Sequence, residues 1–135
     1  MCAIVAYTGK QPAREVLVDG LKRLEYCGYD SSGIAILNNP PYWVRKVGKV
    51  AELEQRVWQD APEGVVGMAR TRWVTHGKPA ENNAHPHIDC TGKVYLAHKG
   101  IIENYLLLKK RLAAAGHSFR SETDTEVLAH LIESL

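Results

Sequence analysis

The chain contains short runs of β-branched residues and stretches of apolar residues with helical spacing. The two kinds of segment follow one another in an irregular order. Runs typical of strands lie at about residues 2–7, 33–37, 42–47, 65–69 and 93–98. Apolar residues with helical spacing follow Pro12 and recur over residues 50–57, 101–112 and 127–135. Because strands and helices do not alternate strictly, the pattern favours an α+β fold over a doubly wound parallel sheet.

Three local signals bound these predicted elements. Two asparagines and two prolines at residues 38–41 predict a turn between two strands. Gly116 is placed as the C-terminal stop of the third helix. Thr123 and Glu126 have the spacing of a capping box, which predicts that the last helix begins there.

Composition excludes several classes of protein. The 135 residues fit one domain, and 17 basic against 15 acidic side chains give a net charge of +2. That charge is too small to indicate a nucleic acid or an anionic membrane as the partner. No apolar run reaches the roughly 18 residues of a membrane span, and no signal peptide precedes the first strand. We therefore expect a cytoplasmic protein.

The cysteines and the chain end give two further expectations. Cys2, Cys27 and Cys90 show no CxxC spacing, so neither a disulfide framework nor a zinc knuckle is indicated. The chain stops at Leu135 inside a helical pattern, which suggests truncation. An apolar face left exposed in this way would invite association, so a homo-oligomer stays open.

Cys2 is the sharpest candidate for chemistry. Removal of Met1 would leave one residue with a thiol and a free α-amine. An α-amine titrates at about 7.7–8.0 and can act as a base near neutral pH. Nucleophile and base would then share one residue, as in enzymes with an N-terminal nucleophile. The alternative is a small buried residue that opens a strand.

Three more polar segments could line a site. Arg72, Thr75 and His76 follow a predicted strand, and an arginine fork suits an α-carboxylate. Gly100 follows another strand and would let backbone N–H groups approach a ligand. Asp124 could pair with a substrate ammonium, although an acidic first turn is also ordinary helix chemistry.

Histidines raise a metal site as a rival interpretation. His85 and His87 flank a proline, with His76 and His98 nearby in the sequence. No carboxylate or cysteine completes a recognised ligand spacing with them. We expect neither a metal nor another cofactor.

Taken in order, these motifs resemble one family along nearly the whole chain. The matching stretches are residues 1–5, 20–30 (GLKRLEYCGYD), 31–35, 71–79 (TRWVTHGKP), 83–87, 100–105 and 118–133 (SFRSETDTEVLAHLIE). They resemble the N-terminal class II glutamine amidotransferase domain, an Ntn hydrolase, of the glucosamine-6-phosphate synthases. The chain would then be the N-terminal portion, residues 1–135, of that domain.

The resemblance implies a fold, a reaction and a site. The fold would be a four-layer αββα sandwich, and the reaction hydrolysis of glutamine to glutamate and ammonia. Cys2 would be the nucleophile, with Gly100 and the residue at position 99 beside the oxyanion. Glutamine would be held by residues at matching positions: Arg72, Trp73, Thr75, His76, Gly77 and Asp124. The ammonia would pass to a C-terminal isomerase domain that binds fructose 6-phosphate and is absent from these residues.

The chain departs from the family at several of these positions. The family has asparagine, an oxyanion-hole donor, where this chain has Lys99, and arginine where it has Cys27. It has glycine at Ala3 and Ala6, which would matter if those positions needed positive φ. Arg70 replaces a small or neutral residue and adds charge beside the pocket.

Two functions therefore remain open. The first is an active glutaminase for glucosamine 6-phosphate synthesis. The second is an impaired or inert relative that keeps the fold and glutamine binding, because Lys99 alters the oxyanion hole and a retained Met1 would block the α-amine.

Overall fold

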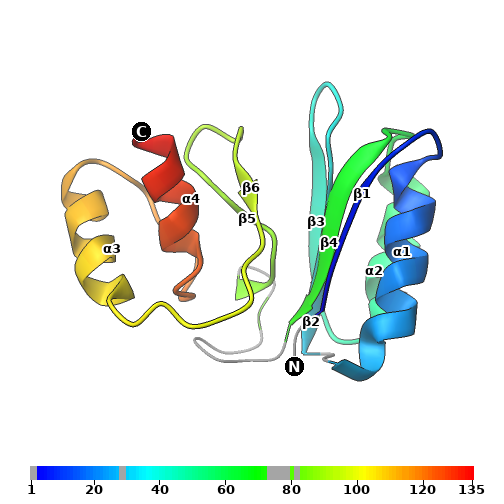
Figure 1. Ribbon diagram of the computed structural model, residues 1–135, viewed down its shortest axis with the longest axis horizontal. Helices are drawn as coiled ribbons and strands as arrows, with labels where there is room; N and C mark the ends of the chain where they lie inside the picture. The colour runs from blue at the N-terminus through cyan, green and yellow to red at the C-terminus, as the bar shows by residue number, and fades with distance from the viewer. Residues whose placement is uncertain (1–2, 28–29, 73–79, 81–82) are drawn as a thin grey trace.

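The chain folds into four layers, and the computed structural model describes residues 3–27, 30–72, 80 and 83–135. Two helices, α1 (Ala13–Leu24) and α2 (Val50–Asp60), cover one face of a four-stranded sheet. Beyond its other face lie a short two-stranded sheet and then α3 (Tyr105–Ala114) and α4 (Glu126–Glu133), as Figure 1 shows. The α+β class and the αββα arrangement expected from the resemblance are confirmed.

The larger sheet is antiparallel throughout, in the order β1-β4-β2-β3. Its strands are β1 (Ala3–Thr8), β2 (Ser31–Ile36), β3 (Tyr42–Val47) and β4 (Val66–Arg72). The turn at residues 38–41 joins β2 to β3, as predicted. Gly33 of β2 lies opposite Arg70 of β4, and Ser31 lies opposite Arg72. Because side chains of opposed residues share a face, Arg70 and Arg72 extend from the face away from α1 and α2.

The main apolar core lies between this sheet and its two helices. Helix α1 starts directly after Pro12, whose fixed φ suits a helix start, and buries Leu17 and Leu21. Helix α2 buries Leu53 and Val57 against the same core. Each such side chain contributes about 1.5–3 kcal/mol when fully buried. Hydrophobic burial therefore explains the stability of this half of the chain.

The second half has a much smaller apolar core. Its hairpin consists only of β5 (His87–Ile88) and β6 (Tyr95–Leu96), against which α4 packs. Asp89 shapes the hairpin loop, because its Oδ1 accepts hydrogen bonds from the backbone N–H groups of Lys93 (2.9 Å) and Val94 (2.8 Å). Buried apolar side chains of the described residues beyond β4 are few: Ala84, Ile88, Leu112, Val127 and Ala129. Polar contacts consequently carry more of the structure here.

Three predicted boundaries in this half are wrong. The strand expected over residues 93–98 is reduced to β6, and the helix expected from residue 101 begins at Tyr105. The capping box does not form, since α4 begins at Glu126, whose carboxylate accepts from Arg120 N (2.8 Å) and Ser121 N (2.7 Å). The predicted stop at Gly116 is confirmed by its φ of +100° just after α3.

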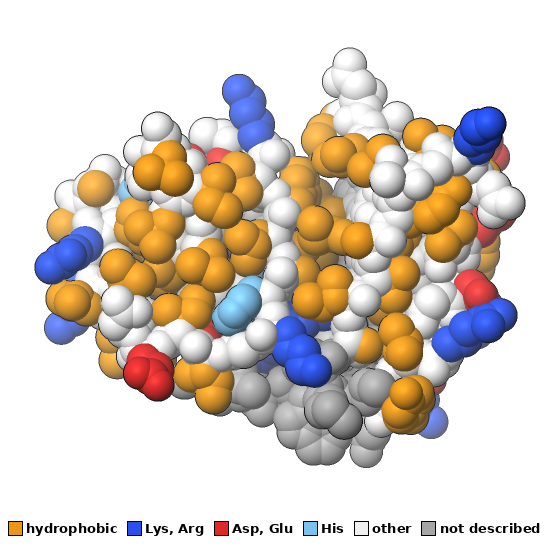
Figure 2. All heavy atoms as spheres, viewed as in Figure 1, with side chains coloured by type: hydrophobic (Ala, Val, Ile, Leu, Met, Phe, Trp, Pro, Cys, Tyr) orange, Lys and Arg blue, Asp and Glu red, His pale blue; other side chains and the backbone are white. Residues whose placement is uncertain are grey.

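An apolar cleft of about 620 Å³ opens between the far end of the larger sheet, at Ala6 and Leu37, and the hairpin residues Val94 and Tyr95. Figure 2 shows apolar side chains on both sides of the opening.

Among the described residues no helix is long and apolar enough to cross a membrane. No non-glycine residue described here has a positive φ, so Ala3 lies in β1 without that strain.

We predict that Gly33→Ala strongly destabilises the protein. A Cβ at this position would overlap the carbonyl oxygen of His85 and lie 2.7 Å from its carbonyl carbon. Overpacking of this kind costs about 1–3 kcal/mol or more. Gly92→Ala is the control, because its site is open and only its φ of +72° opposes a side chain. Urea denaturation should show the larger loss for Gly33→Ala, and equal losses would contradict the packing.

Candidate functional site

One end of the larger sheet gathers the start of β1, the start of β2 and the end of β4. The backbone N–H of Ala3 donates to Thr71 Oγ1 (3.2 Å), and that of Asp30 donates to the carbonyl of Arg72 (3.2 Å). Arg72 is only 2% exposed. The expected residues Cys2, Trp73, Thr75, His76 and Gly77 lie outside the described residues, although Cys2 and Trp73 directly adjoin this end in sequence.

A buried arginine and histidine hold the next segment onto the sheet. Nη1 of Arg70 lies 2.6 Å from Nε2 of His85, and the backbone of His85 contacts Gly33. Burial, with His87 and Arg70 nearby, holds the pKa of His85 well below its usual value. Arg70 therefore packs in the interior and does not simply add an exposed charge beside the pocket.

His87 continues this polar layer into the second half of the chain. Its Nε2 lies 2.7 Å from Thr123 Oγ1, and its ring meets that of His85 edge to face at 4.5 Å. Burial lowers the pKa of His87 to about 3, and the charges of Arg45, Arg72 and Arg70 add to this. A neutral, hydrogen-bonded His87 is a structural link. Arg70 Nη1 lies within 2.7 Å of both ring nitrogens of His85, and Thr123 Oγ1 lies against Nε2 of His87, so a metal ion would have to displace these contacts to bind there.

Asp124 lies one residue beyond that link. Its carboxylate is 2% exposed, and Oδ2 accepts the backbone N–H of Ile102 at 2.7 Å. Oδ1 has a long contact of 3.5 Å from Thr125 Oγ1. The bond to Ile102 brings Asp124 to the loop that contains Lys99 and Gly100. Two segments predicted separately from the sequence thus lie against each other.

The backbone of the Lys99–Gly100 loop has a positive φ at Gly100, a conformation that favours glycine. Gly100 has a φ of +151°, and a Cβ there would lie 3.0 Å from the His98 ring. Both Lys99 and Gly100 are exposed. Exposed backbone at a glycine can approach a ligand closely.

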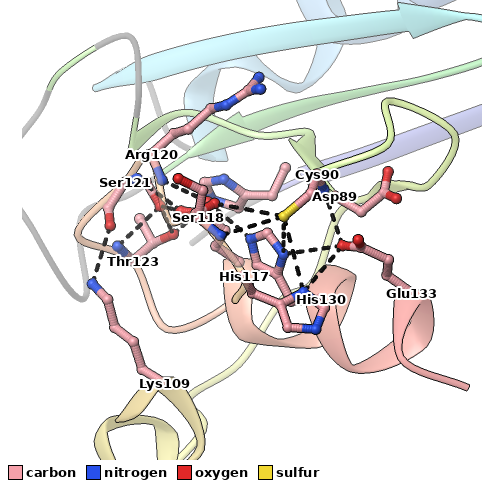
Figure 3. Close-up of polar contacts among 12 residues, drawn as sticks. Asp89, Cys90, Lys109, His117, Ser118, Arg120, Ser121, Thr123, His130 and Glu133 are labelled. Carbon is pink, nitrogen blue, oxygen red and sulfur yellow. Dashed lines mark hydrogen bonds and ion pairs between the residues drawn. The ribbon is translucent and has the colours of Figure 1, made fainter. Parts of the chain in front are cut away.

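A second polar cluster escaped the sequence analysis. Cys90, His117, His130 and Glu133 place one ligand-type atom each within 4.8 Å of one another. Figure 3 shows the Cys90 sulfur facing the two rings and the Glu133 carboxylate. The one usable signal was the spacing of His130 and Glu133, which puts both on one helix face. The other two residues lie far away in sequence.

Comparison with known proteins finds relatives along the whole chain. Residues 71–135 match the family described as glutamine amidotransferase domain. The chain is 54% identical over 130 residues to glutamine–fructose-6-phosphate aminotransferase (isomerizing) of Pyrobaculum aerophilum, covering 96% of this chain and 22% of that protein. The protein of the same name from Bacteroides thetaiotaomicron is 55% identical over 135 residues. That match covers 98% of this chain and 22% of that protein.

Solved structures show the same fold. Glutamine phosphoribosylpyrophosphate amidotransferase from B. subtilis, complexed with ADP and GMP, matches with a TM-score of 0.82 and 26% identity. The match covers all of this chain and 30% of that one. A structure described as the allosteric regulatory enzyme of purine biosynthesis matches with a TM-score of 0.84, at the same identity and coverage.

Fold and comparisons together define a class II, Ntn-hydrolase-type glutamine amidotransferase domain. Within that class the chain is similar, over nearly its whole length, to glutamine–fructose-6-phosphate aminotransferases. It spans about a fifth, 22%, of the length of these curated relatives. The family expectation from the sequence is confirmed.

We predict that acid destabilises the protein partly through His87. The unfolded chain takes up a proton near pH 6.5, whereas folded His87 does so only near 3. Between these values the free energy of unfolding decreases as the pH is lowered, by up to about 1.4 kcal/mol per pH unit for this one proton. His87→Gln removes that term and should flatten the dependence of unfolding free energy on pH between about 6 and 4. An unchanged slope in urea titrations would contradict the assignment.

Proposed function

We propose that this chain forms part of a glutaminase that hydrolyses the glutamine amide and supplies ammonia for amino-sugar synthesis. The observation that carries the proposal is the buried Asp124 carboxylate, bound to Ile102 N–H beside the Lys99–Gly100 loop. High identity to glutamine–fructose-6-phosphate aminotransferases supports the same conclusion. In this proposal the ammonia passes to a sugar-phosphate isomerase domain that binds fructose 6-phosphate.

Glutamine binding uses two opposite charges. Arg72 emerges at the end of β4 and offers a planar fork for the α-carboxylate. Asp124 offers its second carboxylate oxygen to the α-ammonium, since Oδ2 is already used by Ile102. Trp73, Thr75, His76 and Gly77 follow Arg72 in sequence, and we assign them to the walls and hydrogen bonds of the same pocket.

Cys2 is assigned the nucleophile's role. Its sulfur attacks the carboxamide carbon, and its α-amine takes the thiol proton and delivers it to the departing ammonia. Water then hydrolyses the thioester to glutamate and restores the thiol. This chemistry requires that Met1 be removed, since a peptide bond would abolish the basicity of the amine.

Gly100 and Lys99 are assigned to the negative oxygen of the tetrahedral intermediate. A backbone N–H at Gly100 is fixed by the loop, whereas the Lys99 ammonium lies on a long, exposed side chain. Poorly preorganised donors stabilise an oxyanion less well. This exposed lysine favours the second candidate function, an impaired glutaminase that still binds glutamine.

The direct test is release of ammonia and glutamate from glutamine by the purified chain, with its N-terminus determined by mass spectrometry. Turnover that depends on an N-terminal Cys2 and disappears in Cys2→Ser would support the glutaminase. Absence of both turnover and glutamine binding in a folded protein that begins at Cys2 would overturn it. Binding without turnover would support the impaired form.

We predict that Asp124→Asn weakens glutamine binding about 10–100-fold, because a charge-assisted hydrogen bond contributes about 1.5–3 kcal/mol. An asparagine oxygen can still accept the Ile102 N–H, so the loop should keep its fold. Glu122→Gln, an exposed neighbour, is the matched control. Calorimetric titration with glutamine gives the affinities, and equal affinities for both variants would contradict the role of Asp124.

We also predict that Lys99→Asn raises kcat for glutamine hydrolysis by up to about 10²–10³-fold, the usual value of one oxyanion donor. The gain should exceed that of Cys27→Arg, which restores only a nearby charge. Lys110→Asn removes an exposed lysine of α3 and should have no effect. If Lys99→Asn changes nothing in protein that starts at Cys2, the oxyanion assignment is wrong.

A further inference from the structure

We propose that Cys90, His117, His130 and Glu133 form a structural binding site for a thiophilic divalent transition-metal ion, best matched by zinc(II). The site lies at the C-terminal end of α4, whereas Asp124 precedes the helix start. The proposal is independent of the glutaminase assignment and makes no use of its residues. Its basis is the geometry of the four side chains.

All four ligand atoms lie within 4.8 Å of one another, and several of the distances between them approach those of a tetrahedral shell. The Cys90 sulfur lies 3.4 Å from His130 Nδ1 and 3.9 Å from His117 Nδ1. Glu133 Oε2 lies 3.3 Å from each of these two nitrogens. Zinc bond lengths of about 2.0–2.3 Å and tetrahedral angles give ligand–ligand distances of about 3.3–3.6 Å. Side-chain shifts that shorten the longer of these distances would close the shell around an ion.

Three separate segments bring these atoms together. Cys90 follows β5, in the loop that Asp89 shapes, and its backbone N–H donates to Glu133 Oε2 at 3.0 Å. His117 follows Gly116, whose φ of +100° ends α3 and turns the chain. His130 and Glu133 lie three positions apart on α4. The backbone thus holds the ligands near their places without an ion.

His130 also has the outer-shell partner that metal-bound histidines usually have. Its second nitrogen, Nε2, lies 3.3 Å from Glu126 Oε1, while Nδ1 faces the cluster. The Phe119 ring packs at 4.4 Å and restricts the imidazole, which is 1% exposed. A carboxylate that orients a histidine in this way fixes its tautomer and raises its basicity as a ligand.

The donor set selects the metal class. Thiolate and imidazole favour zinc and similar ions, whereas magnesium and calcium prefer oxygen ligands only. Cys90 is exposed, and the side chains of His117 and Glu133 are 13% and 17% exposed, so an ion can enter from solvent. A bound ion would join β5, α3 and α4 in the half of the chain with little apolar core, where a metal adds most stability.

Cobalt(II) titration tests the site directly. The purified chain, reduced and stripped with a chelator, should bind one Co²⁺ and develop thiolate charge-transfer absorption together with intense tetrahedral d–d bands. Zinc should displace the cobalt and remove both. The near-ultraviolet absorption should vanish in Cys90→Ser and persist in Cys27→Ser, the matched cysteine control.

Affinity and thermal stability supply the second measurement. Zinc should raise the unfolding temperature of the wild type and of Glu122→Gln, but not of His117→Asn or Glu133→Gln. Glu126→Gln removes the outer-shell partner of His130, and such a loss typically weakens metal binding roughly 10–100-fold. Loss of a ligand, in His117→Asn or Glu133→Gln, should weaken zinc binding by more than Glu126→Gln does. His117→Asn changes a partly exposed side chain and should fold normally. No Co²⁺ binding by the wild type, or equal binding by wild type, Cys90→Ser and His117→Asn, would overturn the proposal.

Discussion

The backbone of the segment before β5 lies directly on the inner strand β2 at Gly33, and much of the site depends on this contact. Only a glycine leaves room for the His85 carbonyl. Arg70 is opposite Gly33 in the sheet, extends from the same face and reaches the His85 ring. One close approach thus connects the four-stranded sheet to the second half of the chain.

Polar contacts connect the His85 segment to the candidate glutamine site. His87, two residues after His85, lies against Thr123, and Asp124 follows Thr123 with its carboxylate on Ile102 N–H. The segment beyond β4 buries few apolar side chains, so such contacts must hold it. The proposed metal cluster would act similarly at the other end of α4, through His130 and Glu133. Both ends of α4 would then be fixed by polar groups.

The sequence predicted elements with strong local signals and missed those that depend on distant partners. The Tyr42–Val47 strand and the helix after Pro12 follow from alternation and helical spacing. The start of α4 did not follow, because Glu126 binds Arg120 N and Ser121 N instead of capping at Thr123. The role of Asp124 stays a prediction, and the structure places its carboxylate on the N–H of Ile102, two positions after Gly100. Cys90 and His117 were missed because 27 positions separate them in sequence.

The central claim is that glutamine binds between the charge of Arg72 and the charge of Asp124. A crystal structure of the chain with glutamine, in protein carrying Cys2→Ser to prevent turnover, tests this most directly. We expect the α-carboxylate on the Arg72 guanidinium, the α-ammonium on Asp124, and the amide directed toward residue 2 and Gly100. Glutamine bound elsewhere, for example in the apolar cleft by Val94 and Tyr95, would contradict it.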